Sequence, residues 1–567
     1  MIRPAARFFG ALAAWGLLFL ASPGILGRDG LGPLALVALV PWALVCSRSG
    51  PRAFPVEWLA SGAGMCALCA WSSYVWPGTL LFLAIVPGFY MAAAGSLLRL
   101  LARRYLLAVS APVAWVSMET LRGLVDPPFG FGWLRLGTCF HATSWLDGSA
   151  RLFGTAGLSF VAAAFAGGIA DLLRRRVRRD RREARRRSPR WGVLLGSLPL
   201  ALGIALSLST SAPATSPGPR VLLVQPAFEQ HRKMAPRDWR ELAQESIALT
   251  AKGIAGAAGS PPDLVAFGET MFPFPLAEEH LAAAFERGAR APAWARDQIS
   301  EDWIAQMDAV EATWIRGRIL GERGVLPPGT SFLAGVEYHS LHGSEIRRQN
   351  AVLLWDAAGK RAGVGGKIHL VPGAEDLCGA ERIGFVRRLV ESVAGYVPDL
   401  LAFDRTSVLD LRTRDGRTFR FGATVCFDNC YDDPYTEPLR RGAVDFHLVC
   451  SNEAWYERSF EYDQMIAFSR LVAIATGRSV VRATNAGISA VIDPAGREVA
   501  RLAVPGEGDR MVAGTLSAVV PVPLEGQSGV RTAFVRWERA WTALWLFLPF
   551  LLGFFVIRGG YTSFERG

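Results

Sequence analysis

The sequence predicts two structural classes in one chain: a polytopic α-helical membrane domain of about eight spans and an α/β domain outside the membrane. Two observations carry this prediction. The 567 residues are 51% hydrophobic with a mean hydropathy of +0.24, and long apolar windows gather near both ends of the chain. Between residues 212 and 539, short apolar runs instead alternate with helical patterns, which is typical of α/β domains.

The predicted spans are windows that meet or approach the roughly 20 apolar residues that a helix needs to cross a bilayer. The first window follows Arg3 and Arg7 and resembles a signal peptide, but the further spans favour an uncleaved anchor. The windows divide the chain into a membrane domain at 1–211, an exterior domain at 212–539, and a final span with a cytoplasmic tail at 540–567. They lie at residues 8–26, 31–46, 56–76, 78–101, 105–121, 152–173, 191–210 and 541–557.

The net charge of +11 is concentrated in one loop at residues 174–190, where eleven arginines accompany Asp180 and Glu183. No aromatic residues interleave these arginines, as a platform for stacking bases would need, so nucleic acid is not an expected partner. The positive-inside rule places the loop in the cytoplasm. Counting spans from this loop places the domain at 212–539 on the periplasmic or exterior side.

The exterior domain follows a linker rich in Pro and Ser and contains a succession of short apolar runs that predict strands. Helical patterns at 236–254 and 461–476 separate some of these runs. Apolar strands that alternate with helices predict sheets covered by helices. The predicted strands lie at 221–224, 264–267, 331–336, 351–355, 418–425, 446–450, 479–483, 488–492 and 511–515.

The exterior domain contains four of the eight cysteines, namely Cys378, Cys426, Cys430 and Cys450. An oxidising compartment would allow pairs among them, and Cys430 with Cys450 is one conceivable disulfide. The Cys and His spacing does not resemble a zinc site, so we expect no metal and no cofactor.

Three residues with chemically reactive side chains each lie close to an apolar run. Glu269 follows the run 264–267, Lys367 lies in Gly-Gly-Lys-Ile-His-Leu-Val-Pro at 365–372, and Cys426 follows the run 418–425. Each alone is more often structural, as a loop carboxylate, a solvated lysine or a buried thiol. Together they supply a base for the thiol proton, a cation that lowers the thiol pKa and stabilises an oxyanion, and a nucleophile that forms a thioester. The set predicts a cysteine-dependent acyltransferase or amidase.

The order Glu269, Lys367, Cys426 resembles the triad of the nitrilase, or carbon–nitrogen hydrolase, superfamily, whose domain is an αββα sandwich. Other motifs are similar to those of apolipoprotein N-acyltransferases, the membrane members of that superfamily. These motifs are Leu-Val-Pro at 370–372 with Glu375, Ser-Asn-Glu-Ala-Trp-Tyr at 451–456, Arg-Ala-Thr-Asn-Ala-Gly-Ile-Ser at 482–489, and Glu-Thr-Leu-Arg-Gly at 119–123 followed by Phe-Gly-Phe-Gly-Trp at 129–133.

The resemblance implies a reaction in the bacterial inner membrane. A phospholipid donates an acyl chain to Cys426, and the thioester passes it to the N-terminal amine of diacylglyceryl-cysteine in an apolipoprotein. Glu269 would be the base and Lys367 the oxyanion partner. The implied partners are the phospholipid donor, the apolipoprotein acceptor and membrane lipid.

The resemblance also implies supporting residues. Glu375 would orient the lysine or the substrate amine. Asp428 lies in Cys-Phe-Asp, where the family usually has Cys-Tyr-Glu, so the hydrogen bonds at this position differ. Trp455 would lie near the acyl-chain site, or pack as a core tryptophan. Glu119 and Arg122 would form a functional pair facing the lipid entrance, or simply snorkel to the interface.

Two other functions remain open from sequence. A membrane-tethered amidase or nitrilase-type hydrolase has the same triad and resolves the thioester with water. About eight spans argue against it, because a tether needs one. A catalytically silent scaffold that binds lipoproteins is the second alternative, and the altered residues after Cys426 favour it slightly.

Overall fold

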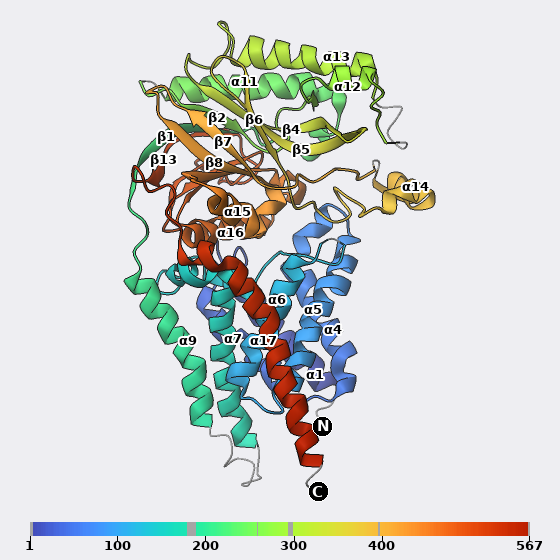
Figure 1. Ribbon diagram of the computed structural model, residues 1–567, viewed down its shortest axis with the longest axis vertical. Coiled ribbons are helices and arrows are strands. Elements are labelled where there is room, and N and C mark those ends of the chain that lie inside the picture. The colour runs from blue at the N-terminus through green and yellow to red at the C-terminus, as the bar shows by residue number, and fades with distance from the viewer. Residues whose placement is uncertain are drawn as a thin grey trace. The chain divides into compact units, whose positions relative to one another are not determined.

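A computed structural model of the protein describes residues 4–126, 128–177, 189–257, 259–292, 299–394 and 397–564. Most of the arginine-rich loop lies outside the described residues. The chain forms two compact units (Figure 1). A helical unit comprises Met1–Ala212, Ser459–Gly477 and Arg531–Gly567, and a β-rich unit comprises Pro213–Arg458 and Arg478–Val530.

The helical unit is built from long apolar helices, and one of its members, α16, lies in the sequence between two strands of the β-rich unit. A kink interrupts α7 at Gly154, where φ is +64°. The described helices are α1 (Pro4–Ala21), α2 (Ala35–Ala38), α3 (Val40–Cys46), α4 (Phe54–Leu68), α5 (Thr79–Leu101), α6 (Leu107–Leu124), α7 (Ala150–Val177), α9 (Pro189–Ser209), α16 (Glu461–Thr476) and α17 (Ala533–Phe564).

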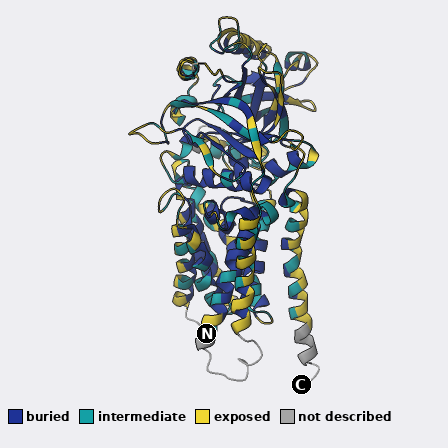
Figure 2. Ribbon diagram, turned by 90° about the vertical axis from the view of Figure 1, so that its left-hand side faces the viewer, coloured by how far each residue is buried: buried dark blue, intermediate teal, exposed yellow. Residues whose placement is uncertain are grey.

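Five of the described helical segments are long and apolar enough to cross a membrane, and they correspond to α1, α5, α7, α9 and α17. Figure 2 shows exposed residues along the outer faces of long helices in this unit, and on α9 and α17 these include Leu198, Leu202, Phe550 and Phe554. Large apolar side chains in such rows are stable against lipid rather than water. The helical unit therefore has the surface of a membrane protein.

Of the remaining three predicted spans, two correspond to interrupted structure and one to a single helix. The window expected at 31–46 is divided between α2 and α3 after a 3₁₀ turn. The window at 56–76 forms α4 and a second 3₁₀ turn, Ala70–Tyr74. The window at 105–121 forms α6, an 18-residue helix that carries both Glu119 and Arg122.

The β-rich unit contains two sheets within the described residues, one of seven strands and one of six. The first has the order β13-β1-β2-β4-β5-β6, with β3 beside β4, and the second has the order β12-β11-β10-β9-β8-β7. The strands are β1 (Thr215–Gln225), β2 (Leu264–Phe267), β3 (Leu276–Ala277), β4 (Ser331–His342), β5 (Glu345–Trp355), β6 (Arg361–Gly366), β7 (Ser407–Arg412), β8 (Thr418–Val425), β9 (Phe446–Ser451), β10 (Ser479–Thr484), β11 (Ala490–Ile492), β12 (Glu498–Arg501) and β13 (Gly514–Pro523).

Parallel strands form the centre of both sheets, and antiparallel strands form their margins. In the seven-stranded sheet, β1, β2 and β4 run in parallel, and in the six-stranded sheet β8, β9 and β10 do so. β6 is antiparallel to β5, which is antiparallel to β4, so β6 runs in the same direction as β2 and β4. The carboxyl ends of β2, β4 and β6 therefore lie at one edge.

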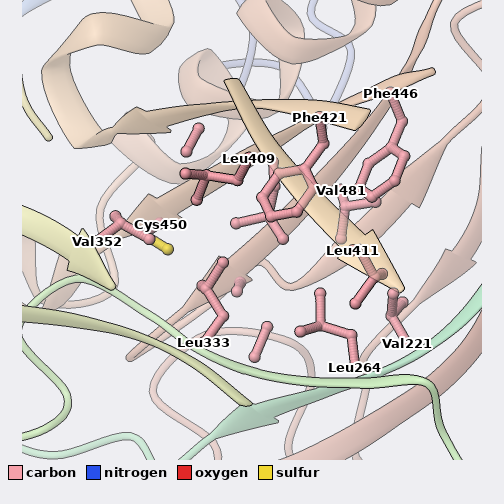
Figure 3. Close-up of a cluster of buried hydrophobic side chains, with 14 of the residues drawn as sticks. Val221, Leu264, Leu333, Val352, Leu409, Leu411, Phe421, Phe446, Cys450 and Val481 are labelled. Atoms are coloured by element: carbon pink, nitrogen blue, oxygen red, sulfur yellow. The ribbon is translucent and has the colours of Figure 1, made fainter. Parts of the chain in front are cut away.

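The core of the unit lies between the two sheets (Figure 3). Val221, Leu264 and Leu333 from the first sheet meet Phe421 and Val481 from the second, and each is completely buried. Runs of apolar residues in these strands, rather than strict alternation, reflect sheets that are covered on both faces. The two sheets stack face to face, as the predicted sandwich requires.

Helices cover the outer faces of the sheets. Leu242 of α11 and Trp314 of a π-helix (Glu311–Ile319) pack on the outer face of the seven-stranded sheet. Tyr435 of α15 contacts His447 of the six-stranded sheet, with ring centroids 5.1 Å apart. The helices of this unit are α10 (Gln230–Lys233), α11 (Trp239–Gly256), α12 (Leu281–Glu286), α13 (Glu301–Val310), α14 (Gly384–Ala394) and α15 (Asp433–Arg441).

Candidate active site

The three residues of the predicted triad follow the carboxyl ends of three strands. Glu269 comes two residues after β2, Lys367 directly after β6, and Cys426 directly after β8. Because β2 and β6 run in the same direction, their following residues share one edge of the seven-stranded sheet. The six-stranded sheet meets this edge, since the Glu269 amide donates to the Ser451 carbonyl at 3.4 Å. Strand ends of α/β sheets are where such folds place their ligand sites.

Gly268 is the residue that allows the two sheets to come this close. A Cβ atom at this position would lie 2.7–2.9 Å from backbone atoms of Thr484, Ser451 and Asn485. The next residues form a tight turn in which Thr270 has a φ of +51°. The Gly-Glu-Thr sequence thus holds the Glu269 carboxylate, which is buried, on a backbone with little freedom to move.

Two carboxylates and one ammonium group form the charged centre of the site. Lys367 Nζ lies 2.7 Å from Glu375 Oε1 and 3.5 Å from Glu269 Oε1. Glu375 Oε2 accepts a further bond from the Val371 amide at 2.8 Å. Lys367 is 1% exposed, so these contacts form in a medium of low dielectric.

The environment of Lys367 keeps it charged. Burial works to lower its pKa, but the acidic groups around it, Cys426, Glu375 and Glu269, outweigh burial and raise the pKa above its usual range. A permanently charged ammonium group of this kind can stabilise negative charge that develops on a substrate oxygen.

Asn350 of β5 joins the two carboxylates, and sequence patterns gave no signal for it. Its Nδ2 donates to Glu269 Oε1 at 2.6 Å and to Glu375 Oε1 at 3.3 Å. The backbone carbonyl of Asn350 accepts a hydrogen bond from the Lys367 backbone amide at 2.9 Å. Asn350 therefore bonds to the lysine backbone and to both acidic side chains, which fixes their separation.

Cys426 is the first residue of a 3₁₀ turn (Cys426–Cys430) and has a φ of +48°. Such backbone is costly for a residue with a side chain and is concentrated at functional sites. The thiol is nearly buried, and burial raises its pKa well above the usual range, with Glu269 acting in the same direction and Lys367 opposing. The expected lowering of the thiol pKa by Lys367 is therefore outweighed, and Cys426 rests as a neutral thiol whose proton a base must remove.

Asp428 connects the turn that begins at Cys426 to the segment that carries Lys367. Its Oδ1 accepts from the amides of Ile368 and His369, at 3.2 and 2.8 Å, and its Oδ2 accepts from the Val425 amide at 3.1 Å. Burial raises the pKa of this carboxyl group to about 6, although His369 works against the rise. Asp428 thus binds both segments that carry Cys426 and Lys367.

Glu453 is another buried acid at this edge, in the turn that follows β9. It pairs with Arg482 at 2.5 Å, and both side chains are essentially inaccessible. Burial raises the pKa of Glu453, whereas the positive charge of Arg482 opposes that rise and favours the ionised carboxylate. Glu453 lies within the Ser-Asn-Glu motif that signalled the family, but the motif alone gave it no role.

The structure places the other predicted residues as follows. Trp455 lies in a 3₁₀ turn (Glu453–Tyr456) and is partly exposed. Glu119 and Arg122 belong to the helical unit and are both buried. Glu119 Oε1 accepts from Trp115 Nε1 and the Leu136 amide, each at 2.7 Å.

Arg122 donates to the carbonyls of Trp133 and Leu134, both at 2.8 Å. Together with the Glu119 contact to Leu136, these bonds hold the loop that follows α6 from inside the unit. Both side chains are buried rather than directed outward, and the expectation that they form a functional pair stays a prediction.

The next features are the bonding state of the cysteines and the arrangement of side chains that could bind a metal ion. None of the eight cysteines, all of which lie in the described ranges, forms a disulfide, so the conceivable bridge between Cys430 and Cys450 is not formed. Cys430 Sγ instead donates to the Phe427 carbonyl at 3.2 Å. In the described ranges, no group of three or more His, Cys, Asp or Glu side chains is arranged to hold a metal ion.

The sandwich fold and the Glu-Lys-Cys cluster at its edge indicate the class of protein to which this chain belongs. Residues 227–519 match the carbon-nitrogen hydrolase family, and the chain belongs to that family. Residues 12–168 match a second description, the apolipoprotein N-acyltransferase N-terminal domain.

Relatives named apolipoprotein N-acyltransferase extend this similarity over most of the chain. The protein of Geobacter metallireducens is 26% identical over 509 residues, which cover 87% of this chain and 86% of the relative. The protein of Chlorobaculum tepidum is 24% identical over 481 residues, covering 83% and 84%. Among solved structures, an amidase from Nesterenkonia sp. matches 59% of this chain and 100% of its own at 17% identity, with a TM-score of 0.35.

Proposed function

We propose that this protein is an acyltransferase that N-acylates lipoproteins. It moves an acyl chain from a membrane phospholipid to the N-terminal amine of diacylglyceryl-cysteine in an apolipoprotein. One observation carries the proposal: relatives named for this activity align with the membrane part and the carbon-nitrogen hydrolase part together, over 87% of the chain. Several long apolar helices agree with a substrate that lies in a bilayer.

In the first half-reaction, Cys426 Sγ attacks the ester carbonyl carbon of the phospholipid. Glu269 takes the thiol proton as the carbon–sulfur bond forms, because the buried thiol rests protonated. The Lys367 ammonium group stabilises the oxyanion. The tetrahedral intermediate then breaks its carbon–oxygen bond, and the lysophospholipid leaves with the proton that Glu269 had received.

In the second half-reaction, the uncharged amine of the acceptor attacks the thioester carbonyl carbon. Glu269 removes a proton from the attacking nitrogen and returns it to the sulfur, so that an amide forms and the Cys426 thiol is restored. Separate acylation and deacylation steps predict ping-pong kinetics. Every proton in this cycle moves between substrate and the protein's own side chains.

The surrounding residues support these roles. Glu375, 2.7 Å from Lys367 Nζ, holds the ammonium group in place. Asp428 fixes the nucleophile turn against the lysine segment by accepting three hydrogen bonds from backbone amides. Trp455, which is partly exposed beside Glu453, is proposed to contact the acyl chain.

We further propose that the chain crosses the bacterial inner membrane about eight times and that the domain at 212–539 faces the periplasm. Five long apolar helices and the basic loop at 174–190 support this topology. A reporter enzyme inserted at residue 182 should remain cytoplasmic, and one inserted at residue 343 should be exported. The opposite pattern would overturn the topology.

The reaction itself is tested with a phospholipid that carries an isotope-labelled acyl chain and a diacylglyceryl lipopeptide. With the wild-type protein, mass spectrometry should find the label on the peptide amine. With Cys426→Ala, the peptide should remain unmodified. Release of the label as free fatty acid, with the peptide unchanged, would favour a hydrolase. If the phospholipid and the peptide both remained unchanged, the protein would be a silent binder.

A further inference from the structure

A second lysine lies at the candidate active site and has no place in the cycle above. Lys233 is the last residue of α10, the short helix that follows β1. Its Nζ donates to the Glu269 carbonyl at 3.2 Å and to Thr270 Oγ1 at 2.8 Å. Its own carbonyl accepts from Trp239 Nε1 at 3.0 Å, which holds the lysine backbone to the start of α11.

The bonds from Lys233 reach the one turn on which the base depends. Thr270 has a φ of +51°, and its hydroxyl also donates to the Glu269 carbonyl at 2.8 Å. Lys233 Nζ, Thr270 Oγ1 and the Glu269 carbonyl thus form a closed triangle of hydrogen bonds. A turn in this sparsely populated conformation persists when surrounding bonds determine it. Lys233 supplies two of those bonds.

The charges around Lys233 are those of the active site. Glu269, Cys426 and Glu453 all interact with it, and they work to keep it charged, but burial lowers its pKa to about 7. Lys367 faces two of the same groups and has its pKa raised. The site therefore holds one lysine that stays charged and another that titrates near neutral pH.

We propose that Lys233 is a positioning residue for Glu269: by binding the backbone of the Glu269–Thr270 turn, it orients the carboxylate toward the Cys426 thiol. This inference deepens the proposed function, on which it rests. Lys233 acts through the base and not on the substrate, so its loss should slow the chemical step and leave substrate binding unchanged.

The test compares Lys233→Met, which keeps the apolar stem, with Lys233→Arg, which keeps a cation and its donors. Thioester formation on Cys426 is followed by intact-protein mass spectrometry across a range of phospholipid concentrations. We expect the maximal rate with Lys233→Met to fall about 10- to 100-fold, as loss of two hydrogen bonds around the base implies. The half-saturating phospholipid concentration should change less than about twofold, and Lys233→Arg should recover most of the rate.

Arg232→Met is the matched control, because Arg232 is the neighbour of Lys233 and its guanidinium pairs with Glu245 at 2.7 Å instead. This variant should keep the wild-type rate. Equal losses in both Met variants, or a raised half-saturating concentration with an unchanged rate in Lys233→Met, would overturn the inference. So would wild-type rates in Lys233→Met. Failure of the wild-type protein itself to form a thioester would overturn the proposed function and this inference together.

Iodoacetamide gives a second readout that needs no phospholipid. Peptide mapping should show that Cys426 is alkylated more slowly in Lys233→Met than in the wild type, because a displaced Glu269 removes the thiol proton less readily. The buried Cys450 should stay unmodified in both proteins and report that the fold is intact. Unchanged alkylation of Cys426 would contradict the positioning role.

Discussion

Asn350→Ala gives the sharpest test of the charged centre, because Asn350 is a neutral residue that has no direct part in the proposed chemistry. The substitution removes the 2.6 Å bond to Glu269 Oε1 and the 3.3 Å bond to Glu375 Oε1. The first of these is short and has a charged acceptor, and such bonds contribute about 1.5–3 kcal/mol. The second is long and adds little. Lys367, 3.5 Å from Glu269, continues to attract the carboxylate after the change.

If the lost energy falls on the transition state for thiol attack, the rate of thioester formation drops about 10- to 150-fold. To measure the rate, the enzyme is mixed with phospholipid and the reaction is quenched at successive times. The acylated fraction is then determined by intact-protein mass spectrometry. Gln349→Ala serves as the control, since neighbouring residues of a strand face opposite sides of the sheet. Gln349 bonds to Ser340 rather than to either acid. A wild-type rate in Asn350→Ala, or an equal loss in Gln349→Ala, would refute the reasoning.

Three further predictions concern other contacts of the site. Glu375→Gln weakens the charge-assisted bond to Lys367, and the initial rate of acyl transfer to the lipopeptide should fall about tenfold. Asp428, whose pKa is raised to about 6 from the ordinary 3.8, binds its proton more tightly when folded. The free energy of unfolding should therefore fall by about 2 kcal/mol as pH rises from 4 to 6. The difference between wild type and Asp428→Asn in denaturant titrations at pH 4 and pH 6.5 should show this loss, and a constant difference would contradict it. Arg482→Met leaves the Glu453 carboxylate buried without its cation, so the free energy of unfolding should fall by about 3–5 kcal/mol, whereas Arg482→Met with Glu453→Leu should lose much less.

The sheet-forming runs could be predicted from sequence because they depend on local patterns. The predicted strand at 264–267 agrees with β2, and that at 418–425 agrees with β8. The structure also brings Lys367 and Glu375 into contact, one of the arrangements that the family resemblance implied. The contacts of Asn350 and Lys233 could not be predicted in this way. Each reaches Glu269 from a different strand or helix, and the contact exists only once the sheet has formed.

The helical unit shows the limits of hydropathy. A sliding window detects apolar composition, but it does not detect a break such as the one between α2 and α3, nor a short helix followed by a 3₁₀ turn. Glu119 and Arg122 illustrate a second limit. Their position near the end of a predicted span suggested contact with the lipid entrance or the interface, whereas both side chains turn inward to bind the loop after α6. Charged residues in apolar helices often have partners that only the tertiary structure identifies.

The central claim is that the acyl chain passes through Cys426 to an amine. The most direct measurement is peptide mapping of the protein after exposure to labelled phospholipid, first without an acceptor and then with the diacylglyceryl lipopeptide. The account predicts a hydroxylamine-sensitive acyl group on Cys426 that disappears as the labelled amide appears on the peptide. Label on another residue, or a Cys426 adduct that persists when the peptide is added, would contradict it.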